Sequence, residues 1–381
     1  MNNKRSKISD SEESIFTSIS SLSNKYNAIN LGQGFPNFDC SEKLKELVNH
    51  YLQNGKNQYT HMAGLDSLRN QICHIKTQLY NRPLNGLKNI CITAGATQAI
   101  FTAICAFVHA GDEVIIIEPA YDSYRPSIEV AGGIVIAYEL KTPNFEIVWD
   151  EFRKLITSKT RMIIINTPHN PTGTVFHKSD LLQLEEIIKE HDIVLLSDEV
   201  YHHIIFDKTL HESAMKYPAL FEKTISIFSF GKTFHATGWK IGYCIGPEKL
   251  INQFKTIHQW NVFCVNSFIQ YALADFLKDE NNYLNLSSFY QKKRDLMTQT
   301  FSKTRLKAIP SKGTYFQLYD YSKICDLDDF EFAKQLVVEY GVASIPISPF
   351  YKSKYQNKVV RFCFAKTDDT ILEAGQRLMK L

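Results

Sequence analysis

The stretch TISIFSFGKTFHATGWK, residues 224–240, joins an apolar run to a polar, glycine-containing turn that carries Lys232. The run 224–228 predicts a buried strand, because short apolar runs bounded by turn residues are typical of sheet cores. A lysine at the carboxyl end of a parallel strand points into the crevice where α/β sheets bind ligands. Lysine is also the side chain that condenses with aldehydes when its surroundings lower its pKa. Taken alone, however, the short S-x-x-K pattern fits a surface lysine in a turn better.

Outward from this stretch, apolar runs alternate with helix-period segments from about residue 65 onward, a pattern typical of a mainly parallel sheet covered on both faces. The expected strands are 89–93, 113–119, 133–140, 161–166, 193–199, 224–230 and 239–246, and the expected helices are 65–78, 97–108, 123–131 and 179–190. After about residue 277 the alternation is less regular, with helices expected at 286–301, 328–340 and 369–380 and strands at 307–310, 313–320, 343–347 and 359–365.

These patterns predict an α/β fold with two domains. The large domain, residues 36–276, would hold a seven-stranded, mainly parallel sheet with helices on both faces. An N-terminal arm, residues 1–35, and residues 277–381 would form a smaller α+β domain. The length of 381 residues is sufficient for two packed domains of this kind.

The bulk composition excludes several functional classes. A net charge of +3 is too small to indicate a nucleic-acid or membrane-surface partner. The polar start of the chain has no apolar core of a signal peptide, and apolar stretches such as 99–110 fall short of the ~18 residues of a membrane span. We therefore expect a cytoplasmic protein. The eight cysteines form no C-x-x-C pair, so we expect buried free thiols and no metal site.

Polar side chains follow two further predicted strands. Asp198 and Tyr201 come at the end of the expected strand 193–199 and just past it, and a carboxylate there could pair with a buried cation such as a protonated pyridine nitrogen. Asn170, between two prolines, follows the run 161–166 and could donate its amide to a phenolic oxygen together with Tyr201. The alternatives are a helix N-cap or turn residue for Asp198 and a plain Asn-Pro turn for Asn170.

The segment CITAGATQ, residues 91–98, connects a strand to a helix through Gly95, Ala96 and Thr97. Backbone N–H groups and a hydroxyl at a helix N-terminus can hold a phosphate, although many such turns hold nothing. Ser229 and Lys240 flank the Lys232 turn with a hydroxyl and a second cation, both suited to a phosphate. Tyr121 follows the next strand and could stack on an aromatic ring, although a lone tyrosine is more often a packing residue.

The combination is far more specific than its parts. The strand ends offer a phosphate nest, an amide, a carboxylate with a phenol, and an amine. Pyridoxal 5'-phosphate has the four groups that match them: a phosphate, a phenolic oxygen, a pyridinium nitrogen and an aldehyde. The sequence therefore predicts a pyridoxal-phosphate site.

The chain also resembles the class I/II aminotransferases of pyridoxal-phosphate fold type I over essentially its whole length. It is most similar to the branch that contains the kynurenine/glutamine aminotransferases and the bacterial methionine aminotransferases. The motifs that match, in order, are INLGQGFPNF (29–38), NQYTHMAG (57–64), TAGATQA (93–99), NTPHNPTG (166–173), SDEVY (197–201), SFGKTFHATGWKIGY (229–243) and VRFCFAK (360–366).

The resemblance implies a role for each matching residue. Lys232 would carry the cofactor as a Schiff base and then move the proton, Asp198 would pair with the ring nitrogen, and Asn170 and Tyr201 would bind the ring oxygen. Tyr121 would stack on the ring. The expected phosphate ligands are Gly95, Ala96, Thr97, Ser229, Lys240 and, across a homodimer interface, Tyr59 of the other subunit. The expected substrate ligands are Arg361 at the α-carboxylate, assisted by Asn170 and Gly34, with Phe16, Phe35, Tyr59, Tyr121 and Phe263 as candidate walls of the side-chain pocket.

The resemblance implies transfer of the amino group of methionine or another large uncharged or aromatic amino acid to a 2-oxo acid. Glutamine, phenylalanine, tyrosine, leucine and kynurenine are the other expected donors. Aspartate is not expected, because no second arginine stands where it could receive a side-chain carboxylate. Three alternatives remain at this point: a cysteine-S-conjugate β-lyase, a kynurenine/glutamine aminotransferase, and a non-catalytic pyridoxal-phosphate-binding regulatory module. For Phe16 and Phe263, and for Arg361, ordinary packing and a surface ion pair are the competing interpretations.

Overall fold

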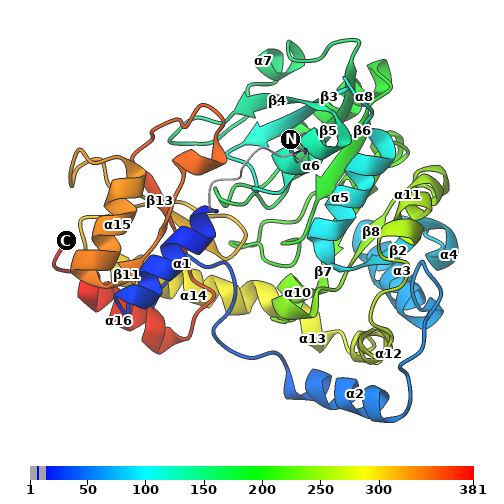
Figure 1. Ribbon diagram of the computed structural model, residues 1–381, viewed down its shortest axis with the longest axis horizontal. Coiled ribbons are helices and arrows are strands. Elements are labelled where there is room, and N and C mark those ends of the chain that lie inside the picture. The colour runs from blue at the N-terminus through cyan, green and yellow to red at the C-terminus, as the bar shows by residue number, and fades with distance from the viewer. Residues whose placement is uncertain (1–6, 8–13) are drawn as a thin grey trace, which may run out of the picture.

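The computed structural model describes residue 7 and residues 14–381 (Figure 1), so residues 1–6 and 8–13 of the predicted N-terminal arm lie outside the described residues. Its centre is a seven-stranded sheet in the order β2-β8-β7-β6-β5-β3-β4. Neighbouring strands run parallel except β8, which is antiparallel to both β2 and β7. The strands are β2 (Ile90–Thr93), β3 (Glu113–Glu118), β4 (Ile134–Glu139), β5 (Thr160–Asn166), β6 (Val194–Asp198), β7 (Thr224–Ser229) and β8 (Gly242–Ile245). The predicted seven-stranded, mainly parallel sheet is confirmed.

Helices cover both faces of this sheet. Successive side chains of a strand point to opposite faces, so the apolar strands present buried side chains on both sides. Met162 and Ile164 of β5 pack into one core with α5, α6 and α11, whereas Ile163 and Ile165 pack into another core with α8. The helices of this part are α3 (Asp66–Tyr80), α4 (Gly86–Asn89), α5 (Gly95–Phe107), α6 (Tyr124–Ala131), α7 (Trp149–Arg153), α8 (Lys178–Glu190), α9 (Pro218–Phe221), α10 (Phe230–Thr233), α11 (Glu248–Asn261) and α12 (Ser267–Phe276).

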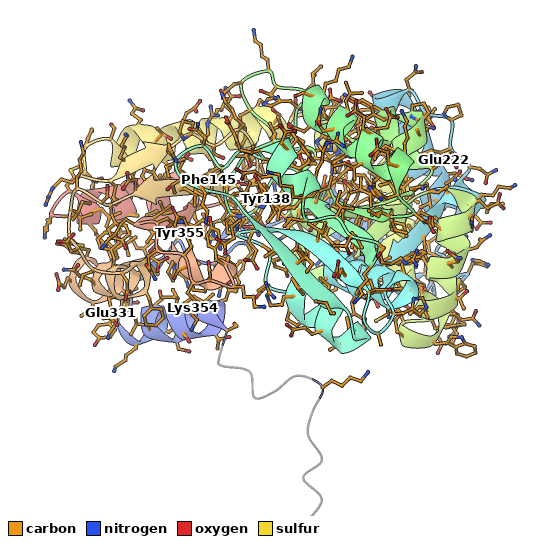
Figure 2. All side chains as sticks on the ribbon, turned by 90° about the horizontal axis from the view of Figure 1, so that it is seen from above. Tyr138, Phe145, Glu222, Glu331, Lys354 and Tyr355 are labelled. Carbon is orange, nitrogen blue, oxygen red and sulfur yellow. The ribbon has the colours of Figure 1, made fainter. Side chains whose placement is uncertain are left out.

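The C-terminal part carries a four-stranded antiparallel sheet in the order β12-β13-β10-β9. Its strands are β9 (Lys307–Ile309), β10 (Phe316–Asp320), β12 (Ile345–Pro346) and β13 (Val359–Cys363), and its helices are α13 (Asn281–Leu284), α14 (Leu286–Phe301), α15 (Asp329–Tyr340) and α16 (Asp368–Leu378). Figure 2 shows Glu331 and Lys354 of this part at one end of the molecule and Glu222 at the other.

The N-terminal segment belongs to the same end of the molecule as the small sheet. Helix α1 (Ile15–Lys25) packs on α15, and β1 (Ile29–Asn30) pairs in parallel with β11 (Val342–Ala343). The run 343–347, predicted as one strand, is in fact divided, because Ala343 pairs with Asn30 whereas Ile345 pairs with Arg361. Helix α2 (Glu42–Gln53) lies apart from α1 and packs on α12 (Figure 1).

The register of the large sheet brings the predicted functional motifs together. Asn166 at the end of β5 pairs with Asp198 at the end of β6, and Ser229 at the end of β7 pairs with Gly242 at the start of β8. Gly242 also pairs with Thr93 at the end of β2. Since β5, β6 and β7 are parallel, their carboxyl ends meet at one edge, where α/β sheets bind ligands. Among residues 7 and 14–381, no helix is both long and apolar enough to cross a bilayer.

Candidate active site

A cavity of about 220 Å³ lies at this edge, between the large sheet and the C-terminal part. Predicted site residues that line it are Phe16, Gly34, Ala96, Thr97, Tyr121, Asn170, Asp198, Tyr201, Lys232 and Arg361. Gln33, Ile100, Asn166, Val200 and Phe316 complete the lining. The motifs quoted from distant parts of the sequence therefore surround one cavity.

Lys232 lies on α10, a single helical turn after β7 rather than the open turn expected from the sequence. Ser229 begins this turn, and its Oγ accepts a hydrogen bond of 3.4 Å from the Lys232 backbone N–H. The Nζ of Lys232 donates to the hydroxyl of Tyr315 over 2.9 Å and to the carbonyl of Gly34 over 3.5 Å. Burial lowers the pKa of Lys232 to about 8, so its reactive neutral form is populated near physiological pH.

Asp198 ends β6 and is buried. Its Oδ2 accepts a 2.6 Å hydrogen bond from the hydroxyl of Tyr124, and its Oδ1 accepts one of 3.3 Å from the Val200 backbone N–H. Burial raises the pKa of Asp198 to about 6, and the bond from Tyr124 partly opposes this. A carboxylate held in this way is stabilised by any cation that enters the cavity beside it.

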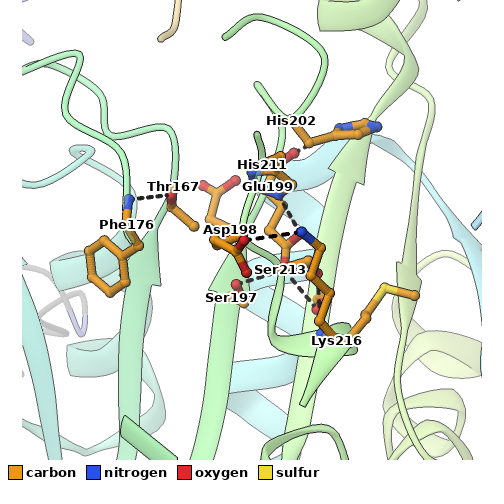
Figure 3. A network of polar contacts seen from close by, with 12 residues as sticks. Thr167, Phe176, Ser197, Asp198, Glu199, His202, His211, Ser213 and Lys216 are labelled. Atoms are coloured by element: carbon orange, nitrogen blue, oxygen red, sulfur yellow. Dashed lines mark hydrogen bonds and ion pairs between the residues drawn. The ribbon is translucent and has the colours of Figure 1, made fainter. Parts of the chain in front are cut away.

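The next residue, Glu199, points away into a buried polar network (Figure 3). Its carboxylate accepts hydrogen bonds of 2.9 to 3.0 Å from the hydroxyls of Ser197, Ser213 and Ser226, and one of 2.8 Å from His211. Burial alone would raise the pKa of Glu199, but the bonds from His211 and Ser213 outweigh it and lower that pKa. The network fixes the end of β6 and therefore the position of Asp198.

An anion cradle lies at the start of α5, which begins at Gly95 rather than at Thr97 as expected. Gly95 has a φ of +80°, a conformation that side chains other than glycine's rarely adopt, and the N–H groups of the first turn have no helical partners. A Cβ on Gly242 would lie 3.2 Å from the Ala96 nitrogen and would occupy the cradle from behind. The Thr97 hydroxyl lies 3.3 Å from the hydroxyl of Tyr121.

Lys240 lies beside this cradle, since a Cβ on Gly95 would be 3.6 Å from the Lys240 Cε. Its ammonium makes no hydrogen bond or ion pair with any residue of the described chain, that is, residues 7 and 14–381. An unpaired cation next to free N–H groups at a helix N-terminus has the chemistry of a phosphate site.

Arg361, on β13, faces the cavity from the other side and is 1% exposed. Its Nη1 donates to Oδ1 of Asn170 over 2.8 Å, and its Nη2 donates to the carbonyl of Gly32 over 3.1 Å. The rings of Phe316 and Phe16 lie 3.8 Å and 5.5 Å from its guanidinium carbon. Its Nε has no hydrogen-bond partner among the described residues, so a donor remains for a ligand carboxylate.

The other predicted site residues do not line the cavity within this one chain. Gly95 and Lys240 lie at the cradle beside the lining residue Ala96, and Ser229 begins the turn that carries Lys232. Tyr59 is 81% exposed and packs edge to face against Phe263, with ring centroids 5.1 Å apart. Phe35 is also exposed, and its carbonyl accepts a hydrogen bond from Lys366. Nothing in the single chain therefore brings Tyr59, Phe263 or Phe35 to the cavity.

Three aromatic residues at the site were not predicted from the sequence. Tyr124 binds Asp198, Tyr315 binds Lys232, and Phe316 covers Arg361. A lone tyrosine or phenylalanine has no local pattern that separates such a role from packing, although Tyr315 and Phe316 stand in the apolar run that predicted β10. All eight cysteines are free, and the described residues contain no group of three or more potential ligands that could hold a metal.

The fold and this arrangement of an amine, a buried carboxylate, an anion cradle and a buried arginine with a free donor are typical of a class of enzyme that uses pyridoxal phosphate to transfer amino groups. A family model for aminotransferase class I and II matches residues 26–378. The chain belongs to this family, whose members use pyridoxal phosphate, and it is an aminotransferase.

Relatives are similar along nearly the whole chain. The methionine aminotransferase of Escherichia coli K12 is 44% identical over 378 residues, which are 99% of this chain and 98% of the relative. Kynurenine–oxoglutarate transaminase 1 of Homo sapiens is 33% identical, covering 94% of this chain and 93% of the relative. The crystal structure of YbdL from Escherichia coli, for which a methionine aminotransferase function is identified, superposes with a TM-score of 0.96 at 43% identity, covering 99% of each chain.

Proposed function

We propose that this aminotransferase moves the amino group of methionine, and of other large uncharged or aromatic amino acids, to a 2-oxo acid by means of pyridoxal phosphate bound at Lys232. The observation that carries the proposal is the cavity itself. Lys232, Asp198 and the cradle at Ala96 face it from the large sheet, and Arg361 faces it from β13.

The donor set fits pyridoxal phosphate group by group. The cradle at Gly95 and Ala96, with the unpaired Lys240, fits the phosphate, and it would be filled by a Cβ on Gly242. Asp198 fits the ring nitrogen, and Asn170 and Tyr201 fit the phenolic oxygen. Tyr121 lines the cavity where it could stack on the ring. Gly95, Ala96, Thr97, Ser229 and Lys240 are thus proposed as phosphate ligands.

When bound, pyridoxal phosphate supplies an aldehyde that condenses with amines and a ring that withdraws electrons from the substrate's α-carbon. Asp198 holds positive charge on the ring nitrogen, because a buried carboxylate without a cation beside it is costly. The free amine of Lys232 would take the proton from the substrate's α-carbon at its Nζ and would return it to the carbon contributed by the cofactor's aldehyde, on the other side of the shared nitrogen. Arg361 and Asn170 bind the α-carboxylate and set the angle at which that proton faces Lys232.

The substrate's side chain would lie among apolar groups. Phe16 and Phe316 line the cavity near Arg361, and neither can pair with a charged side chain. Arg361 is the only arginine among the residues that line the cavity in the described part of the chain. One arginine serves one carboxylate, so an amino acid with a second carboxylate would bury an unpaired charge. Methionine is the first choice because the Escherichia coli relatives carry that function.

We also propose that the enzyme works as a homodimer. The exposed Tyr59 and Phe263 pack together outside their own cavity, as expected of residues that contact a partner's site. The large domain would comprise residues 36–276, and residues 1–35 and 277–381 would form the smaller domain. Both substrates would be small molecules, an amino acid and a 2-oxo acid.

The test is a half-reaction followed by absorbance. The protein loaded with pyridoxal phosphate should absorb near roughly 410–430 nm, and methionine alone should replace this band by one near roughly 330 nm. Lys232→Ala should lack the first band, and aspartate should convert the wild-type band far more slowly than methionine does. A preference for aspartate over methionine would contradict the substrate proposal. Release of pyruvate and ammonia from cysteine S-conjugates, with no conversion by methionine, would instead indicate a β-lyase.

A further inference from the structure

The free amine of Lys232 is held by a short chain of hydrogen bonds that involves a residue outside the predicted site. Its Nζ donates to the hydroxyl of Tyr315 over 2.9 Å, and that hydroxyl donates in turn to the carbonyl of Gly34 over 2.5 Å. Tyr315 is fully buried, and burial raises its pKa well above the ordinary value, so it stays a neutral phenol. The phenol therefore keeps one hydrogen and offers one accepting oxygen.

The backbone around Tyr315 is fixed from several sides. The backbone N–H of Thr314 donates to Ile204, and the carbonyl of Tyr315 accepts from the N–H of Phe364 just after β13. The ring packs against Tyr201 and Tyr290, with centroids 5.1 Å and 5.8 Å away. Because the ring is constrained in this way, the Tyr315 hydroxyl has one position. A hydroxyl with one position can orient the Lys232 amine that it contacts.

The second contact of the Tyr315 hydroxyl, its hydrogen bond to the Gly34 carbonyl, needs a close approach of the backbone at Gly34. A Cβ on Gly34 would lie 2.8 Å from a ring carbon of Phe316, so only glycine lets this backbone approach the rings of Phe316 and Tyr315. Because the single hydrogen of the Tyr315 hydroxyl is committed to the Gly34 carbonyl, it cannot be donated to the lone pair of Lys232. The amine is thus held by its own hydrogens, one given to the Tyr315 oxygen over 2.9 Å and one to the Gly34 carbonyl over 3.5 Å, and its lone pair stays free to accept a proton.

We propose that Tyr315 is a positioning residue for Lys232: its oxygen accepts a hydrogen bond from the Nζ whenever the amine is free, and it aims the amine's lone pair at the substrate. This inference rests on the proposed function, because it concerns the lysine that would take the proton from the α-carbon. Tyr315 itself transfers no proton.

The amine is surrounded by other groups that set its charge. Those that face it are Asp198 on β6, Tyr201 after β6, Lys240 before β8, and Arg361 and Cys363 on β13. Tyr290 of α14 packs against the Tyr315 ring and is not one of these groups. Loss of the Tyr315 acceptor should change the pKa of Lys232 in one direction. An acceptor stabilises an ammonium more than a neutral amine, so its removal favours the neutral amine and lowers the pKa of Lys232.

The experiment compares the wild type, Tyr315→Phe and Tyr290→Phe as full-length, cofactor-free protein. Pyridoxal phosphate is added across about pH 6 to 10, and its incorporation is trapped by borohydride and located by mass spectrometry of the Lys232 peptide. In the wild type the rate should rise with a midpoint near the pKa of Lys232. In Tyr315→Phe the midpoint should fall by about one pH unit, the size of a lost hydrogen bond to a charged group.

The loaded enzymes give a second measurement. Tyr315→Phe should lower kcat for methionine about tenfold and leave KM nearly unchanged, because the lost bond orients the base and does not bind the substrate. Tyr290→Phe is the matched control, since it removes a buried hydroxyl from the same cluster that has no hydrogen-bond partner in the described chain. It should leave the midpoint and kcat as in the wild type.

The outcomes separate the two proposals. If the wild type incorporates no pyridoxal phosphate at Lys232, the proposed function is wrong and this inference falls with it. If the wild type reacts but Tyr315→Phe keeps the wild-type midpoint and kcat, only the inference is overturned. Should Tyr315→Phe fail to fold, 3-fluorotyrosine at position 315 keeps the hydroxyl and weakens its oxygen as an acceptor; the midpoint should then move the same way by a smaller amount, and an unchanged midpoint would overturn the inference.

Discussion

The hydroxyl of Tyr124 lies 2.6 Å from Oδ2 of Asp198, and both side chains are buried. Asp198 comes from the end of β6, whereas Tyr124 begins α6, more than seventy residues earlier. The bond matters because burial raises the pKa of Asp198, and the phenol is a donor that favours the ionised form. Tyr124 therefore helps to keep the carboxylate charged, which is the form that can pair with a cationic ring nitrogen.

Tyr124→Phe should weaken the binding of pyridoxal phosphate about tenfold, the usual effect of losing one hydrogen bond to a charged group. The expected cause is a further rise in the pKa of Asp198. Equilibrium titration of cofactor-free protein with pyridoxal phosphate measures the effect. Tyr138→Phe is a suitable control, since this tyrosine binds the Val148 N–H far from the cavity. Equal affinities in Tyr124→Phe and the wild type would show that the phenol does not support Asp198.

Arg361→Lys should raise KM for methionine at least about tenfold, because a lysine keeps the charge but loses the planar fork that binds a carboxylate in two places. The absorbance of the bound cofactor should stay unchanged, since Arg361 is expected to touch only the substrate. Steady-state kinetics over a range of methionine concentrations gives both constants. Arg153→Lys, which affects a surface pair with Glu186, is the control. A normal KM in Arg361→Lys would assign the carboxylate to another group.

Gly242→Ala should weaken pyridoxal phosphate binding at least about tenfold, because the new Cβ would lie 2.6 Å from the Phe228 carbonyl and 3.2 Å from the Ala96 nitrogen. Binding of pyridoxal, which lacks the phosphate, should change much less. Gly238→Ala is the matched control, as a Cβ there meets no atom within 4 Å. Equal losses for both ligands would mean that the substitution disturbs the sheet rather than the cradle.

The charge of Lys232 should make the cofactor-free protein less stable at neutral pH. Its pKa is about 8 in the fold, below the ordinary 10.5, so the unfolded chain binds the extra proton more tightly. This cost is complete below about pH 8 and disappears as the pH rises toward 10.5. Lys232→Met, which removes the charge and keeps the length, should therefore raise the melting temperature at pH 7 and lose that advantage at pH 10. An advantage that is equal at both pH values would argue against the lowered pKa.

Much of the fold could be predicted from the sequence, because buried parallel strands are short apolar runs with clear ends. The runs 161–166 and 224–230 became β5 and β7 within one residue at each end. The helices α1, α2, α11 and α12 were not predicted, although α1 begins at a serine N-cap whose Oγ accepts a hydrogen bond from the Thr17 N–H. Their position depends on tertiary contacts, as in the packing of α2 on α12.

The site residues also fall into two groups, those that the sequence pattern predicted and those that it did not. Lys232, Asp198, Asn170 and Thr97 follow strands or begin helices, so their place at one sheet edge follows from the topology. Arg361 was assigned by resemblance alone, because its role depends on how the small sheet meets the large one. Tyr124 and Tyr315 could not be found at all, since hydrogen bonds to Asp198 and Lys232 join residues about 74 and 83 positions apart.

The pairing of β1 with β11 sets an order in which this enzyme can be completed during its own synthesis. Asn30 and Leu31 are synthesised about three hundred residues before their backbone partners Ala343 and Cys363. The large sheet has all its strands once residue 245 has emerged. The nascent chain can therefore form that sheet before the partners of Asn30 and Leu31 have been synthesised. Arg361, which lines the cavity from β13, is synthesised more than a hundred residues after the last strand of the large sheet, so the substrate pocket is completed only after that sheet can have formed.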